Sequence, residues 1–245
     1  MNERFIYPTK PDDILKELTD SKSNEIDDFV NAFPKEILNF SESFSKSYKK
    51  YLELYQITSK HQNSRNIEQI EFVTFFTYQI LNNLFISERI FLLGFEVASG
   101  NILRQVAEGV AVVVLCSINF EISRVSKRKQ IKFSFFDSFK QDKPFARSNN
   151  AIRHLENNRT IIQFSEQAID LLVTIKKQCN EYSHPNVFNT SAFMSFEKLG
   201  RMYIGGCFDR GKIENYQVGL EFRAFLCSTF SNLIDGLKIN IEKLF

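Results

Sequence analysis

The chain has 245 residues, and its 43% hydrophobic content, with 26 Phe and 8 Tyr, supplies ample apolar surface for a core and excludes a disordered chain. Its 31 basic and 29 acidic residues leave a net charge of +2, so no global field draws it to nucleic acid or a membrane, and any such contact must be local. Because no linker rich in Pro, Gly or Ser divides the sequence, we expect a single helical domain over residues 1–245.

The four cysteines are widely spaced and show no zinc-ligand pattern, and the polar segment MNERFIYPTK does not resemble a signal peptide. We therefore expect reduced thiols in a cytoplasmic protein that has no disulfide framework, metal or cofactor. The longest uninterrupted apolar run, at 110–116, is far shorter than the roughly 20 residues of a membrane span. We expect no membrane contact.

Residues 1–66 are expected to form outer helices. One or two short helices precede Pro34, and a longer amphipathic helix then begins, because proline is well tolerated in the first turn. Apolar residues recur at helical spacing through Tyr55, and the polar sequence HQNSRN at 61–66 ends the helix.

Residues 67–184 are expected to form the core. Helical spacing predicts one helix from Ile67 to about Phe95, a second over 92–117 and a third over 161–184, with a short helix over 145–157. Gly94 and Gly100 mark a place where the chain bends or one helix ends, or where a neighbouring helix approaches closely.

The remaining chain is expected to form a loop and hairpin over 185–217, followed by a C-terminal helix over 218–245. Strand-like residues on both sides of DRGK predict a β-hairpin over 201–217. The predicted fold is mostly α: a helical bundle of about seven to nine helices, with a small β-hairpin insertion near 201–217.

Arg104 and Glu108 stand out because they lie one turn apart on the same face of an otherwise apolar helix. A structural ion pair packed against other helices is one interpretation, since buried pairs commonly serve packing and register. The other is that Glu108 holds the Arg104 guanidinium for a phosphate, which arginine can bind through two hydrogen bonds.

A second polar pair closes the 161–184 helix in the sequence CNEYSHP. Asn180 and His184 share one face, and Pro185 ends the helix. A histidine that titrates near neutral pH can act as a general acid or base, with the amide orienting its ring or holding a phosphate oxygen. The alternative is that His184 caps the last helical carbonyls.

CNEYSHP resembles the motif of the HEPN superfamily of helical ribonucleases and nucleotide-binding domains, in which an arginine, a polar residue, three further residues and a histidine end a core helix. Asn180 matches the polar position and His184 the histidine, whereas Cys179 occupies the position of the arginine. Without a guanidinium there, this position cannot stabilise the charge of a phosphorane. GNILRQVAEG likewise resembles an Arg-x-x-x-Glu helix of HEPN-like bacterial proteins, and the resemblance covers roughly residues 67–184.

The resemblance implies a protein that binds or cleaves RNA, in a toxin, antiphage or abortive-infection system, with a partner from the same system and as a homodimer. In a metal-independent endoribonuclease, His184 would be the general acid/base, Asn180 would position the phosphate or the ring, and Arg104, held by Glu108, would stabilise the charge. Alternatively, catalysis is lost and RNA binding remains. A different class is a non-catalytic interaction protein, or regulatory subunit, whose Arg104, Glu108 and His184 form a structural network. A small-molecule or nucleotide sensor is a third.

Further cations are candidates for contacts with a nucleic-acid backbone: Lys127, Arg128, Lys129 and Lys177. The first three belong to the basic run SKRK, which is either a solvated loop or, with Phe133, Phe135 and Phe136, a surface that stacks bases. In RSNNAIRH, Arg147 and His154 also approximate the HEPN spacing, and we interpret that match as a coincidence in a solvated helix start.

Overall fold

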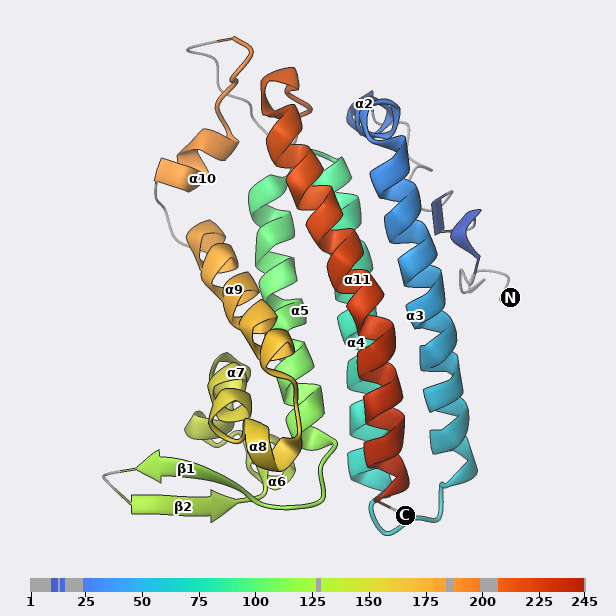
Figure 1. The fold of residues 1–245 in the computed structure, drawn as a ribbon, viewed down its shortest axis with the longest axis vertical. Coiled ribbons are helices and arrows are strands. Elements are labelled where there is room, and N and C mark those ends of the chain that lie inside the picture. Colours follow the sequence, from blue (N-terminus) through green and yellow to red (C-terminus); the bar gives the residue numbers. More distant parts are fainter. Residues whose placement is uncertain are drawn as a thin grey trace.

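Long helices that run up and down beside one another form the body of the protein in the computed structural model (Figure 1). The structure describes residues 10–12, 14–15, 24–126, 129–183, 187–198 and 207–244. The long helices are α3 (Pro34–Lys60), α4 (Ile67–Leu92), α5 (Glu96–Cys116), α9 (Glu166–Ser183) and α11 (Ile213–Glu242). The predicted mostly α bundle with a small hairpin is confirmed.

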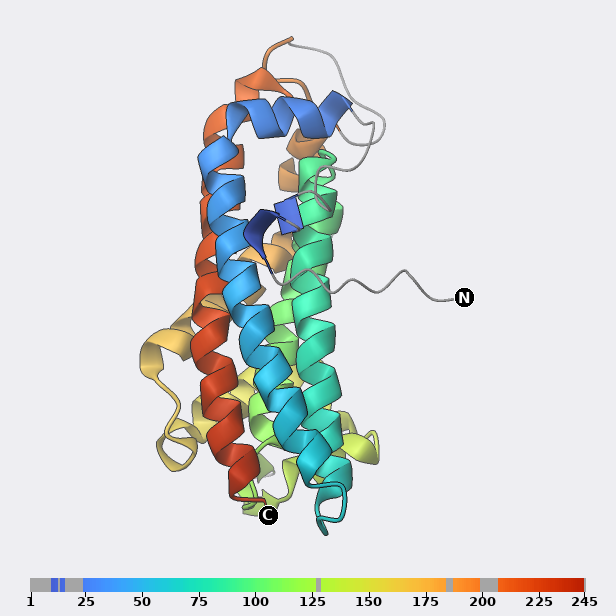
Figure 2. The same ribbon diagram turned by 90° about the vertical axis from the view of Figure 1, so that its right-hand side faces the viewer.

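Shorter elements close the two ends of the bundle. At one end, α2 (Asn24–Ala32) crosses above the long helices in Figure 2, and α10 (Val187–Ala192) follows α9. A 3-10 turn, Arg210–Lys212, leads into α11. At the other end lie the strands β1 (Ile122–Ser126) and β2 (Lys129–Phe133), the helices α6 (Phe135–Lys140), α7 (Ser148–Asn157) and α8 (Arg159–Ile162), and the 3-10 turn Pro144–Ala146.

The hairpin lies earlier in the chain than predicted. β1 and β2 pair antiparallel, with Ile122 opposite Phe133 and Ser126 opposite Lys129. Residues 201–206 of the predicted hairpin lie outside the described residues, and the remainder is a 3-10 turn followed by α11. The C-terminal helix therefore begins at residue 213 and not at 218. Its early start buries Tyr216 and Leu220, which are four residues apart on one face.

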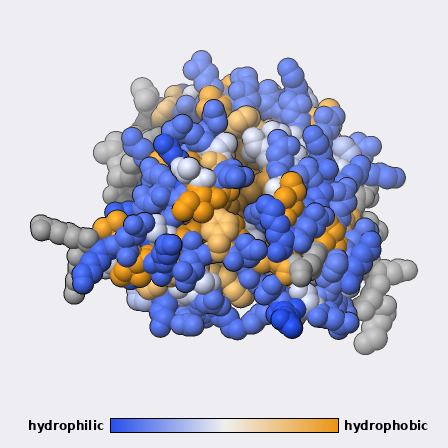
Figure 3. All heavy atoms as spheres, turned by 60° about the horizontal axis from the view of Figure 1, so that its bottom comes forward, coloured by the Kyte–Doolittle hydropathy of each residue, from blue (hydrophilic) through white to orange (hydrophobic). Residues whose placement is uncertain are grey.

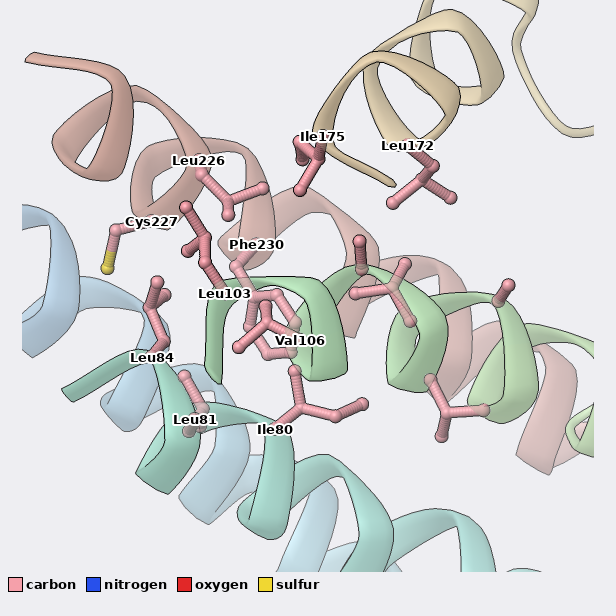
Figure 4. Packing of buried hydrophobic residues seen from close by; sticks show 14 of the residues in the cluster. Ile80, Leu81, Leu84, Leu103, Val106, Leu172, Ile175, Leu226, Cys227 and Phe230 are labelled. Carbon is pink, nitrogen blue, oxygen red and sulfur yellow. The ribbon is translucent and has the colours of Figure 1, made fainter. Parts of the chain in front are cut away.

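Part of the core forms where the apolar faces of α4, α9 and α11 meet around α5. Figure 4 shows this contact, with side chains from α4 (Ile80, Leu81, Leu84), α5 (Leu103, Val106), α9 (Leu172, Ile175) and α11 (Leu226, Cys227, Phe230). The later part of α5 is buried on all sides, as expected for a central helix. The face drawn in Figure 3 is largely hydrophilic, with apolar side chains around a hollow near its centre.

Among the described residues, α5 is the helix long and apolar enough to cross a membrane by length and composition. Within its most apolar window, however, 78% of the residues are buried inside the protein. That burial is typical of the core helix of a soluble protein.

The turn between α4 and α5 depends on Gly94. Its φ of 79° lies in the left-handed region, and a Cβ added here would come within 2.2 Å of the backbone nitrogen of Cys207. Glycine is therefore required both by the backbone conformation and by the approach of a distant segment. This turn sets where α5 starts and, with it, the position of Arg104.

Candidate functional site

The predicted pair on α5 is formed. Arg104 Nε donates a hydrogen bond to Glu108 Oε1 over 3.1 Å, and the two side chains are 29% and 11% exposed. The guanidinium thus lies at the edge of the bundle, where solvent reaches it, while the carboxylate is largely enclosed. Arg104 therefore meets one part of the expectation for a phosphate-binding arginine, which is access from solvent.

A second cation reaches the same carboxylate from the facing helix. Lys176 Nζ of α9 lies 3.8 Å from Glu108 Oε1, and it also donates a hydrogen bond to the backbone oxygen of Asn149 on α7. The Lys176 side chain is 26% exposed. Arg104 and Lys176 thus meet at one carboxylate oxygen, so this cluster carries more positive than negative charge.

The helix α9 continues this surface toward the position of the predicted histidine. Asn180 lies one turn beyond Lys176 on the same face and is half-buried, and Lys177 is exposed. His184 lies outside the described residues. The structure therefore brings Arg104, Glu108 and Lys176 together, with Asn180 one turn along α9, and does not describe where His184 lies relative to them.

Cys179 occupies the interior side of α9, at the position where the HEPN motif has arginine. Its side chain is 2% exposed. Burial raises the pKa of the Cys179 thiol to about 11, although the nearby charges of Arg223 and Arg104 act in the opposite direction. The thiol is therefore neutral near pH 7, and it is not a substitute for a guanidinium.

Of the three cations predicted to contact nucleic acid near the hairpin, one lies among the described residues. Lys129 is exposed on β2, whereas Lys127 and Arg128 lie outside the described residues. The prediction that the neighbouring aromatic residues stack bases is wrong for Phe133 and Phe135, which are buried. Both rings pack edge to face against His154, so their faces are used within the protein.

Arg147 and His154 have separate partners, and of the two only Arg147 is solvated as expected. Arg147 forms an exposed ion pair with Asp142, with Nε 3.1 Å from Oδ1. His154 is buried, and its Nε2 lies 2.7 Å from the backbone oxygen of Phe145. Burial lowers the pKa of His154, which favours the neutral ring and a structural role.

Sequence reasoning missed a more deeply buried ion pair between α4 and α11. Arg223 Nε lies 3.8 Å from Glu88 Oε2, and the two side chains are 5% and 0% exposed. Arg223 donates hydrogen bonds to the backbone oxygen of Gly219 over 2.9 Å and to Ser99 Oγ over 2.5 Å. The signal that singled out Arg104, a charge within an apolar helix, is also present at Glu88 and Arg223.

Arg223 has hydrogen-bond partners in addition to the ion pair, whereas Glu88 has none among the described residues. Neither oxygen of Glu88 has a hydrogen-bond donor among the described residues. Burial raises the pKa of Glu88 to about 7, and the positive charge of Arg223 opposes this shift only in part. Glu88 is therefore a mixture of neutral and charged forms near neutral pH, while Arg223 remains charged.

A second buried pair lies close by, at the start of α11. Lys212 Nζ lies 3.2 Å from Glu96 Oε1 and donates a hydrogen bond to the backbone oxygen of Ala192 over 2.6 Å. Asp209 organises the turn that places Lys212, because its carboxylate accepts hydrogen bonds from the backbone N–H groups of Phe196, Glu197 and Gly211. Through Lys212, this turn contacts both Ala192 at the end of α10 and Glu96 in the first turn of α5.

Three of these buried groups, Glu96, Lys212 and Arg223, line a cavity of about 450 Å³. The rest of its lining comes from α4, α5, α9, α10 and α11, and includes Cys179. Arg104, Glu108 and Lys176 are not part of its lining. The helix α10, which contributes to the lining, lies at the end of the bundle opposite the hairpin (Figure 1).

No protein-family model, no curated protein and no solved structure matches this chain.

Proposed function

We propose that this chain is an HEPN-like protein that binds RNA through phosphate contacts on the surface where α5 meets α9. The observation that carries the proposal is that Arg104 and Lys176, from two helices, meet at the single carboxylate of Glu108 and remain partly exposed. The resemblance of CNEYSHP to the HEPN motif supports the choice of RNA as the ligand.

The chemistry of this cluster suits a phosphate group. Glu108 holds Arg104 through Nε, which fixes the plane of the guanidinium before a ligand arrives. Arginine then offers a fork of donors that matches two phosphate oxygens, and lysine adds a positive charge. Exposed Lys177 and half-buried Asn180 extend the surface along α9. Contacts with phosphates alone would give RNA binding with little sequence preference.

Cleavage belongs to the same proposal through His184. With Arg104 in place of the missing motif arginine, His184 would act as general acid/base in attack of the 2′-hydroxyl on the adjacent phosphate. A homodimer, a cytoplasmic location and a role in a toxin or defence system, with a protein partner from that system, complete the proposal. These rest on the resemblance.

One observation favours a second candidate function, a non-catalytic interaction protein. Glu108 is largely enclosed, and its ion pair with Lys176 holds α5 to α9. In addition, the motif position of the arginine carries the buried Cys179. In this alternative the cluster stabilises the bundle, and the partner is a protein.

A binding titration separates the two. Fluorescence anisotropy of a labelled single-stranded RNA would be followed with wild type, Arg104→Gln and Arg159→Gln. Arg159 is the matched control, because it also forms an ion pair with a glutamate, Glu166, but lies on α8 and is exposed. We expect Arg104→Gln to weaken binding about tenfold, equivalent to about 1.4 kcal/mol, and Arg159→Gln to leave it unchanged.

The non-catalytic interaction protein is the better account if the wild type does not bind RNA. The same holds if Arg104→Gln lowers the midpoint of thermal unfolding and leaves RNA binding unchanged. Cleavage is tested separately with the same RNA in EDTA, comparing wild type with His184→Ala. Products with cyclic-phosphate ends that disappear in His184→Ala would establish the ribonuclease. Binding without cleavage would leave an RNA-binding protein.

A further inference from the structure

The cavity between α5, α9, α10 and α11 has the size of a small-molecule site. Its volume of about 450 Å³ falls within the range of roughly 300–1,000 Å³ that ligand pockets occupy. It combines charged groups that are almost fully buried with apolar walls. That combination is typical of sites that orient a ligand by one polar end and enclose the remainder.

The polar end of the cavity is preorganised. The Arg223 guanidinium lies 4.0 Å from the centre of the Phe91 ring and is held by hydrogen bonds to Gly219 and Ser99. Lys212 lines the same cavity and is held by Glu96 and the backbone of Ala192. Neither cation has to be ordered when a ligand enters, which lowers the entropic cost of binding.

Gly219 permits this arrangement. A Cβ at this position would lie 2.8 Å from Phe91 Cζ and 3.3 Å from an amino nitrogen of Arg223. The absence of a side chain at residue 219 therefore lets the aromatic ring and the guanidinium stack directly beside α11. The same absence leaves space within the cavity.

Apolar side chains form much of the cavity lining, beside the polar residues Gln178, Ser191 and Asn215. Leu103 and Phe91 are buried in its wall, and Phe222 is half-buried. At the mouth, Phe196 is 48% exposed and Val218 is 67% exposed. Apolar side chains with this much exposure on two segments at one opening favour a ligand whose body is apolar.

The charge balance at the polar end favours an anion. Glu96 faces Lys212 directly, whereas Glu88 lies 3.8 Å from Arg223 and has no hydrogen-bond donor among the described residues. Arg223 and the Cys227 thiol on α11 are the titratable groups that interact with Glu88. Because the pKa of Glu88 is raised to about 7, the carboxylate only partly offsets the charge of Arg223.

We propose that this cavity binds a small organic anion with an aromatic or otherwise flat apolar body, whose acidic group lies toward Arg223 and Lys212 and whose body lies between Leu103, Phe222 and Phe196. The site does not use the cations of the RNA surface, since Arg104 and Lys176 do not line it. It adds a small-molecule ligand to the chain whether or not RNA binds.

The test uses two fluorescent probes that differ in charge. 8-Anilinonaphthalene-1-sulfonate carries an acid on an aromatic body, and N-phenyl-1-naphthylamine is the same ring system without the sulfonate. The full chain would be titrated at pH 6, where most of Glu88 is neutral. We expect saturable, one-site binding of the sulfonate, at least tenfold tighter than binding of the neutral probe.

Two blocking variants locate the site. Ala192→Trp fills the cavity from α10, and Val218→Trp fills its mouth from an exposed position that can accept a large side chain without unfolding. Ala168→Trp, half-buried near the start of α9, is the control. We expect each blocking variant with native circular dichroism to weaken sulfonate binding at least tenfold, and Ala168→Trp to leave it unchanged.

Glu88→Gln tests the charge argument. It keeps the shape of the side chain and removes the negative charge beside Arg223, so at pH 8 it should tighten sulfonate binding about threefold to tenfold and leave the neutral probe unaffected. The proposal is overturned if no saturable sulfonate binding occurs, if binding survives both blocking variants, or if Glu88→Gln changes the two probes equally. Equal binding of the two probes by the wild type would also overturn it.

Discussion

Arg223 on α11 and Glu88 on α4 form an ion pair in the interior of the bundle, with Nε 3.8 Å from Oε2 and the carboxylate fully buried. The pair sits beside Phe91, whose ring lies under the guanidinium. The contribution of this pair to the free energy of unfolding therefore depends on pH and on the presence of both side chains.

The first prediction concerns the pH dependence of stability. The pKa of Glu88 is raised by burial from 4.5 to about 7, so the native protein retains a proton that the unfolded chain loses. The free energy of unfolding should therefore fall by about 3 kcal/mol between about pH 4.5 and 7. Glu88→Gln should remove this fall, measured by urea unfolding at pH 5 and pH 8.

Glu68→Gln is the control for this measurement, because Glu68 forms an exposed ion pair with Lys140. It should keep the pH dependence of the wild type. The same pH dependence in Glu88→Gln as in the wild type would show that Glu88 does not titrate in this way.

The second prediction concerns the coupling of the pair. Arg223→Met leaves the Glu88 carboxylate buried without its counter-ion and should lower the free energy of unfolding by about 3–5 kcal/mol at pH 8. The double variant Glu88→Gln with Arg223→Met should recover part of this loss, because no buried charge remains. Arg159→Met, at an exposed ion pair, should change stability by less than about 0.5 kcal/mol. Additive effects of the two substitutions would contradict direct coupling.

The third prediction compares two glycines. Gly94→Ala introduces a side chain at a positive φ and against the Cys207 backbone, so it should destabilise the protein by at least about 2 kcal/mol. Gly236 lies within α11, and a Cβ there meets nothing within 4 Å. Gly236→Ala should therefore stabilise the protein by about 0.5–1 kcal/mol. Thermal unfolding of both variants checks the pair, and equal effects would refute the stated role of Gly94.

The fourth prediction concerns the turn before α11. Although burial raises the pKa of Asp209, hydrogen bonds from three backbone N–H groups outweigh it and lower that pKa below 3.8. The stabilisation is present above pH 3.8 and is lost as pH falls through the lower native value. Asp209→Asn should cost about 1–3 kcal/mol at pH 7 and less near pH 3. A cost that does not change between these pH values would argue against the carboxylate as the acceptor.

Much of the helical fold could be predicted from the spacing of apolar residues. The helix predicted from Ile67 to about Phe95 is α4, Ile67–Leu92, and the predicted break at Gly94 is the turn before α5. The hairpin was predicted in the wrong place because residues such as Ile213 and Tyr216 have strand propensity. In the structure, the burial of one helical face and the cap formed by Asp209 favour the 3-10 turn and α11 instead. The strands β1 and β2 were missed because apolar residues do not alternate along β1, and β2 is exposed except at Phe133.

The candidate site could be predicted only where its partners are close in sequence. Arg104 and Glu108 are one turn apart, and helical geometry alone brings them together. The approach of Lys176 to Glu108, and of Arg223 to Glu88, depends on how α5 meets α9 and how α11 meets α4. Such contacts require the packing of the whole bundle, which periodicity does not define.

The most direct measurement of the central claim is the salt dependence of RNA binding. Each phosphate contact with single-stranded RNA contributes about 0.7 to the slope of log K against log salt concentration. If Arg104 binds a phosphate at the α5–α9 surface, the slope for Arg104→Gln should be shallower by about 0.7 than that of the wild type, with Arg159→Gln unchanged. Identical slopes for the wild type and Arg104→Gln would contradict the account.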